Sequence, residues 1–217
     1  MTRPSDAPDP HHQAQLVQDL AHGVEHALLD AVLNLGTGPA DHAAMTVPRA
    51  RVPSAPAWLA GHHPGGARAQ AQMRALYERC LSHYREIVCA DPPDAGYDDI
   101  GALLARFVAA NLGALREIDV TPPMLARLEQ QLAGVLQLSP AWLRADLRER
   151  QSYAEQLAII AVLMRETSAQ AVLEGAAAIA HVQRAAHGYL VQLLGLDADR
   201  ITITGNGLAY ADADATA

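Results

Sequence analysis

The segment Leu157–Met164 consists of eight consecutive apolar residues and constrains the fold more than any other part of the chain. A helix that is apolar on every side must be covered on every side, so this segment predicts the central helix of a packed helical domain. Two helical turns span about 12 Å, whereas the hydrocarbon core of a membrane is about 30 Å thick. We therefore predict a core helix and no membrane span.

The composition favours helices over sheets. Half of the 217 residues are hydrophobic, which is enough for a substantial core, but Phe107 is the only phenylalanine. The abundance of Ala and Leu indicates helices that pack closely through small side chains, because aromatic and β-branched residues favour strands. The sequence predicts an all-α protein.

Charge and cysteine content exclude several classes of partner and site. The formal net charge is −8, and all 16 basic residues are arginines without a basic block. Such a chain lacks the positive surface that binds phosphates, so we expect no nucleic acid partner. Cys80 and Cys89 lie about 13 Å apart on one predicted helix, which is too far for a disulfide. The polar, proline-rich start differs from a secretory signal and predicts a cytoplasmic protein.

The first third of the chain divides into an arm and a linker. Within residues 1–35, apolar residues at helical spacing predict one amphipathic helix from Gln13 to Leu35, with Leu16, Leu20 and Val24 on its apolar stripe. Residues 36–66 are rich in proline and glycine, so we predict a linker without regular elements, docked through Trp58 and Leu59.

Residues 67–210 read as one helical domain. Caps, prolines and apolar stripes predict six helices, at about 67–89, 100–118, from 122, from 140, 152–173 and 176–194. Ser152 and Glu155 have capping-box spacing just before the apolar run and predict the start of the central helix. Ile201–Thr204, followed by Gly205-Asn206-Gly207, predicts a β-hairpin. The expected fold is a compact, bundle-like or orthogonal domain of about six helices with this small hairpin and a disordered tail, residues 211–217.

One motif has the pattern of a metal site. His22-Gly23-Val24-Glu25-His26 fits the H-x-x-E-H pattern of inverted zinc proteases, in which two histidines one turn apart hold zinc and a glutamate polarises water. Its position opposite the apolar stripe of an arm helix, with a glycine inside it, favours an exposed polar face instead. The remaining histidines indicate solvated or structural side chains: His11, His12, His42, His62, His63, His181 and His187. We assign no metal ligand.

No residue pattern predicts a catalytic or cofactor site. A Gly-x-Ser-x-Gly motif and a phosphate-binding loop are both missing from the sequence. Glu155 and Gln156 adjoin the apolar run, where capping and interhelix hydrogen bonds account for them. A buried Glu155 would have a raised pKa. We assign no catalytic and no cofactor-binding residue.

In the C-terminal two-thirds of the chain, Gln151-Ser-Tyr-Ala-Glu-Gln156 precedes an apolar helix, and Gly195-Leu-Asp197 is followed by Ile201-Thr-Ile-Thr204 and Gly207. By these motifs this part of the chain resembles a family of bacterial helical proteins known as a domain of unknown function. It covers about residues 67–210. It implies a compact helical domain and supplies no activity or site residue.

Three hypotheses for the function follow. The first is a non-enzymatic protein-interaction or structural module, because the stripe of the arm helix must find its own domain, a second copy or another protein to cover it. The second is a metal-dependent hydrolase that uses His22, Glu25 and His26. The third is a protein that holds an apolar small molecule between helices.

Overall fold

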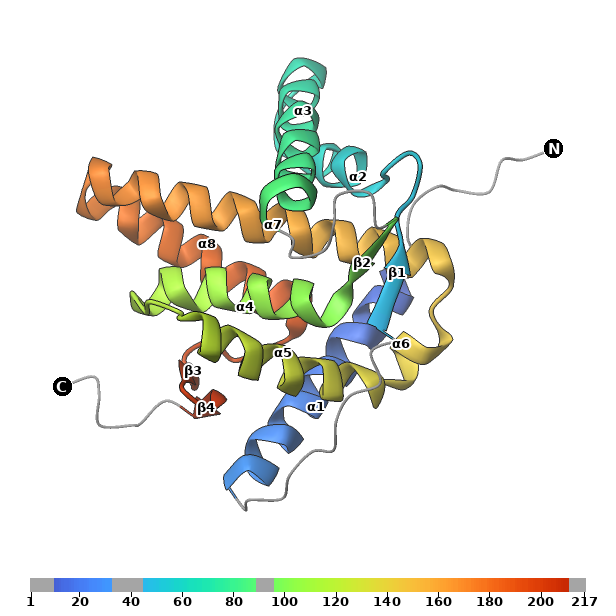
Figure 1. The fold of residues 1–217 in the computed structure, drawn as a ribbon. Helices are drawn as coiled ribbons and strands as arrows, with labels where there is room; N and C mark the ends of the chain where they lie inside the picture. The colour runs from blue at the N-terminus through green and yellow to red at the C-terminus, as the bar shows by residue number, and fades with distance from the viewer. Residues whose placement is uncertain (1–9, 33–44, 89–95, 211–217) are drawn as a thin grey trace.

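The computed structural model describes residues 10–32, 45–88 and 96–210 (Figure 1). These parts contain eight α-helices: α1 (Pro10–Val32), α2 (Ala55–Gly61), α3 (Ala67–His83), α4 (Ile100–Arg116), α5 (Pro122–Gln137), α6 (Pro140–Arg144), α7 (Leu147–Glu174) and α8 (Ala176–Leu194). A π-helical turn, Tyr84–Val88, continues α3. The strands form two antiparallel pairs, β1 (Thr46–Pro48) with β2 (Tyr97–Asp99), and β3 (Ile201–Thr204) with β4 (Gly207–Tyr210).

Helix α7 is the centre of the fold, as the apolar segment predicts. Leu157 and Ile159 are fully buried and Met164 is 2% exposed, while Leu163 is half-buried. Figure 1 shows α7 crossing the molecule with α2 and α3 on one side and α4 and α8 on the other. Six of the eight α-helices lie within residues 67–210, together with the hairpin β3–β4, so the predicted all-α class is confirmed.

The start of α7 differs from the prediction. The helix begins at Leu147, where the Asp146 side chain accepts a hydrogen bond from Glu149 N at 2.9 Å and Asp146 N donates one to Glu149 Oε2 at 2.8 Å. Asp146 and Glu149 therefore form the capping box, six residues before the predicted pair. Ser152 and Glu155 share the same spacing but lie buried inside the helix, because the chain is already helical when it reaches them.

Helix α1 packs against its own domain. Leu16, Leu20 and Val24 are all buried, as members of the same hydrophobic cluster as the residues of α4 and α7. The Asp19 carboxylate accepts hydrogen bonds from Ala141 N at 2.8 Å and Ser139 Oγ at 3.2 Å, which ties α1 to the start of α6. The sequence left open whether this stripe packs on its own domain, on a second copy or on another protein. In the described part of α1 it packs on its own domain.

The region predicted as an unstructured linker contains regular elements. Within its described residues 45–66, β1 pairs with β2, and α2 begins with a proline in its first turn. Proline is tolerated there because the first helical N–H groups have no partner within the helix. The prediction of no regular element is therefore wrong for residues 45–66. Leu59 packs against the core and Trp58 is half-buried, so the predicted docking is confirmed.

Local signals set most other boundaries correctly. Asp99 caps α4 by accepting a hydrogen bond from Ala102 N, and Gly195 follows α8 in the left-handed conformation with φ 62°. Gln131 of α5 holds the hairpin, since Leu208 N donates to its Oε1 at 2.7 Å. The predicted tail, residues 211–217, lies outside the described residues, and no helix within them is long and apolar enough to cross a membrane.

Candidate functional site

The His22-Gly23-Val24-Glu25-His26 motif is described only in part. His22 is exposed on α1, whereas the side chains of Glu25 and His26 lie outside the description. Close packing explains the glycine at position 23, because a Cβ built on it would lie 2.7 Å from Val135 Cγ1 on α5. Among the described residues no three His, Cys, Asp or Glu side chains are grouped to hold a metal ion.

The other histidines do not converge on one site. His62 Nδ1 lies 2.8 Å from the carbonyl oxygen of Trp58, one helical turn earlier, and His181 is exposed. His187 is 41% exposed and its Nε2 lies 3.5 Å from Asp199 Oδ2. The side chains of His11, His12 and His42 lie outside the described residues.

Glu155 is the buried carboxylate that the sequence singled out. It is 1% exposed, and its Oε2 accepts hydrogen bonds from Ser54 N at 2.9 Å and Ala55 N at 3.0 Å. It therefore caps the first turn of α2 from another helix. Burial raises the pKa of Glu155, and this outweighs the opposing effect of the two backbone hydrogen bonds. These contacts give the carboxylate a structural role between α7 and α2.

A second buried carboxylate beside Glu155 is also structural. Asp98 of β2 is 3% exposed. Its Oδ1 lies 2.8 Å from Arg49 Nε and its Oδ2 lies 3.0 Å from Arg85 Nη2. The pairs join β2 to the chain after β1 and to the π-helical turn. Two half-buried arginines thus share one buried carboxylate as their acceptor.

A groove runs along α4 and α7, and we call it the α4–α7 groove. It has a volume of about 690 Å³. Small and apolar residues form its floor: Ala109, Ala110, Gly113 and Ala114 of α4, and Ala161, Val162 and Ala171 of α7. The connection Ile118–Val120 with Leu125 of α5 forms one wall, and Ile179 and Val182 of α8 close the far end.

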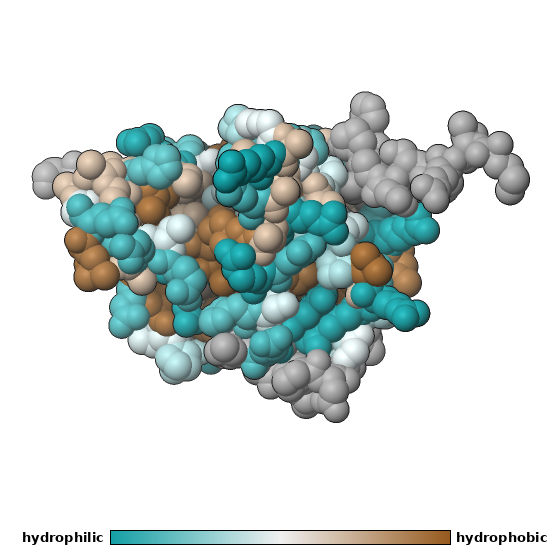
Figure 2. Space-filling view, turned by 90° about the horizontal axis from the view of Figure 1, so that it is seen from above, coloured by the Kyte–Doolittle hydropathy of each residue, from teal (hydrophilic) through white to brown (hydrophobic). Residues whose placement is uncertain are grey.

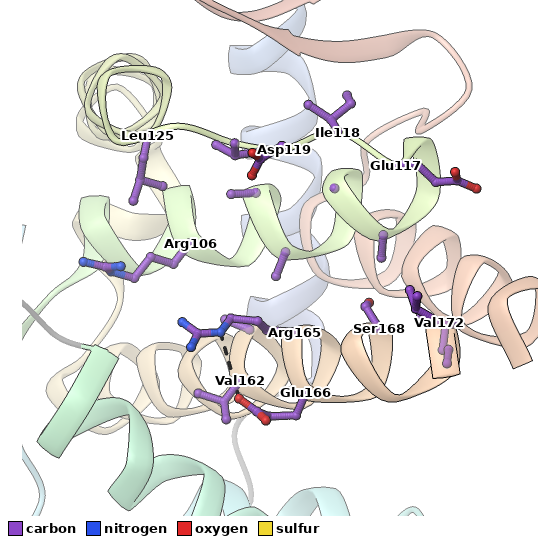
Figure 3. A pocket seen from close by; sticks show the side chains of 18 of the residues that line it. Arg106, Glu117, Ile118, Asp119, Leu125, Val162, Arg165, Glu166, Ser168 and Val172 are labelled. Atoms are coloured by element: carbon purple, nitrogen blue, oxygen red, sulfur yellow. Dashed lines mark ion pairs between the residues drawn. The ribbon is translucent and has the colours of Figure 1, made fainter. Parts of the chain in front are cut away.

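Charged side chains lie at the ends and rims of the groove, and Ser168 of α7 is a further polar residue of its lining. Figure 3 shows Arg106 of α4 and Arg165 of α7 at one end, and Glu117 and Val172 at the other. Arg165 Nε lies 3.9 Å from Glu166 Oε1, and both side chains are more than half exposed. His83 Nε2 lies 4.0 Å from the same Glu166 oxygen. The groove is therefore apolar along its length, with charges where a ligand would enter or end.

Sequence reasoning missed this groove. Its lining comes from five elements between His83 and Val182, and no local pattern brings them together. A signal was present in α4, where Ala109, Ala110, Gly113 and Ala114 repeat at helical spacing. Small residues at that spacing form a shallow helix face. In an alanine-rich chain that pattern is common, so it predicts a helix without predicting a groove.

The fold and the groove define an all-α protein with a largely apolar groove in its described surface. Residues 26–211 match the family of unknown function DUF6683. This is most of the chain, so the protein belongs to that family. The resemblance predicted for residues 67–210 is confirmed, and the match extends it into α1. No curated protein and no solved structure matches the chain.

Proposed function

We propose that the protein is a non-enzymatic binding module that holds an elongated apolar ligand in the α4–α7 groove. The volume of about 690 Å³ carries this proposal, because small-molecule sites measure about 300–1,000 Å³ and are mostly apolar with a few polar groups. A bound chain of ten methylenes would gain about 8 kcal/mol from burial, before the losses of association are subtracted.

The polar groups of the groove support binding rather than covalent catalysis. Ser168 is the hydroxyl side chain in its lining, and its Oγ donates a hydrogen bond to Met164 O at 2.7 Å within α7. A serine nucleophile needs a base that accepts its proton. Here that proton is directed to a backbone carbonyl of its own helix.

Filling the groove tests the proposal. We expect decanol to shift the methyl resonances of Val162, Val172 and Val182 saturably, and Ala110→Trp to abolish these shifts by occupying the floor of the groove. The control is Ala169→Trp, an exposed position on α7 outside the lining. Two-dimensional methyl NMR measures the shifts, and circular dichroism checks that both variants are folded. Absent shifts in the wild type, or equal shifts in Ala110→Trp, would contradict the proposal.

Protein binding is the second candidate function. The surface that we propose for it lies at the end of α7, because the apolar stripe of α1 is covered by its own chain. Val172, which lines the end of the groove, and its neighbour Leu173 are 70% and 81% exposed. Figure 2 shows apolar surface at the same end of the molecule. Exposed apolar patches mark interaction sites. We propose that a second copy of the chain covers these two residues.

The hydrolase hypothesis and the cytoplasmic location stay predictions. A hydrolase that uses His22, Glu25 and His26 requires zinc, retained at about one ion per chain after dialysis. Metal analysis of the untagged protein measures this directly. A metal-free, folded protein would remove the hypothesis.

A further inference from the structure

We infer that the ligand of the α4–α7 groove is an aliphatic carboxylate, whose carboxylate binds Arg106 and whose chain runs along α4 toward Glu117. This inference rests on the proposed function, because it assigns a chemical class to the ligand of the same groove. Three observations support it: Arg106 has no partner among the described residues, the acidic residues are unevenly distributed around the groove, and the apolar floor has a limited length.

Among the half-buried arginines of the described residues, Arg106 differs from the others because it has no hydrogen-bond or ion-pair partner. Five arginines in the described residues are half-buried, and four of them have partners. Arg49 and Arg85 pair with Asp98, Arg116 donates to three backbone carbonyls, and Arg150 donates to Leu143 O and lies over Trp142. Arg106 has no hydrogen bond or ion pair with any described residue.

A half-buried guanidinium without acceptors is suited to an incoming anion. Five N–H donors in a planar fork match the two oxygens of a carboxylate, and such charge-assisted pairs are about twice as strong as neutral hydrogen bonds. Arg106 stands at one end of an apolar floor, as Figure 3 shows. A ligand that satisfies both features has an anionic head and an apolar body.

The surrounding acids orient this ligand. Glu166 shares the end of the groove with Arg106, but Arg165 and His83 both face its carboxylate. Glu117 and Asp119 are exposed and form no ion pair with any residue that the structure describes. Figure 3 places Glu117 at the far end and Asp119 on the rim formed by the α4–α5 connection. An anion at the far end would meet Glu117, so the head lies at Arg106.

The length of the floor limits the chain. From Arg106 to Glu117, α4 rises about 16 Å. This matches an extended aliphatic chain of medium length. The small residues between them leave room for a chain that lies against the helix backbone: Ala109, Ala110, Gly113 and Ala114.

Three ligands with the same ten-carbon chain test the inference on the full-length protein. We expect decanoate to bind at least about tenfold more tightly than decanol, because one charge-assisted bidentate pair distinguishes them. Decyltrimethylammonium should bind no more tightly than decanol. Arg106→Gln should reduce the affinity for decanoate to that for decanol. The matched control is Arg184→Gln at an exposed position on α8 outside the groove, which should leave all three affinities unchanged.

Calorimetry gives the affinities, and intermolecular NOEs give the orientation. The terminal methyl of decanoate should contact the methyls of Val172, and its C2 protons should contact the side chain of Arg106. Equal affinities for decanoate and decanol in the wild type and in Arg106→Gln would overturn the carboxylate inference and leave the groove as an apolar site. Binding that Ala110→Trp does not reduce, or no binding of any of the three, would overturn the proposed function as well.

Discussion

At the scale of single residues, Glu155 joins two parts of the chain that lie about a hundred positions apart. Its carboxylate accepts the N–H groups of Ser54 and Ala55, and no other described group bonds its second oxygen. Burial disfavours the charged form of a carboxyl group and therefore raises the pKa of Glu155. The stability of the protein should therefore depend on pH through this one group.

The prediction is a stability difference between the wild type and Glu155→Gln that declines with rising pH. The folded protein holds the Glu155 proton more tightly than the unfolded chain does. This contribution is fully present below the ordinary pKa of 4.5 and is lost as pH rises through the raised folded-state pKa. Urea denaturation of both proteins across this range measures the difference. The control is Glu78→Gln at an exposed position on α3. A difference that increases with pH would contradict the direction of the pKa shift.

At the scale of elements, two glycines of α8 have different roles. Gly195 follows the last turn and allows close packing against α1, whereas Gly188 inside the helix affects only the helix propensity of the sequence. Gly195 ends α8 with φ 62°, and a Cβ on it would lie 3.1 Å from Val17 O and 3.0 Å from Ala21 Cβ of α1. Gly188, inside the same helix, has no such neighbour within 4 Å. Gly195 therefore allows α1 to approach the end of α8, while Gly188 only weakens the helix.

Alanine at these two positions should change stability in opposite directions. Gly195→Ala should lower the free energy of unfolding by about 2–3 kcal/mol, from the left-handed backbone and the contact with α1. Gly188→Ala should raise it by about 0.5–1 kcal/mol, because alanine favours a helix over glycine. Chemical denaturation measures both. A neutral Gly195→Ala would show that α1 does not need this close approach.

At the scale of the whole molecule, one hydrophobic cluster joins α1, β1 and α2 to the helices that follow residue 67. The apolar stripe of α1 is covered. Other apolar side chains are exposed, among them Val172 and Leu173 at the groove end of α7. The predicted division into arm, linker and domain stays a prediction. The cluster shows that the described parts of all three share one core.

Self-association should depend on the end of α7. We expect the sedimentation coefficient of the wild type to increase with protein concentration, and that of the double variant Val172→Ser and Leu173→Ser to stay constant. Leu138→Ser is the control, because Leu138 is 80% exposed in another part of the surface, at the end of α5. Analytical ultracentrifugation measures the coefficients. A wild type that remains a monomer at every concentration would contradict this interface.

The sequence by itself determined most of the helices, several of their caps and the hairpin. Asp99, Pro122, Gly195 and the turn at Gly205-Asn206 act on their immediate neighbours, so their effect is visible in a short stretch of sequence. The run Leu157–Met164 also identified the central helix, because an all-apolar helix has no exposed face to place. The family resemblance has the same local basis.

Only the tertiary structure decided what these elements contact. It showed that Glu155 caps α2, that α1 is covered by its own chain, and that Pro-rich residues 45–66 hold β1 and α2. It also showed that Arg106 lies at one end of a groove formed by five elements and has no partner among the described residues. The physical reason is sequence separation: such contacts join residues brought together only by packing, and a single sequence has no local signal for its distant neighbours.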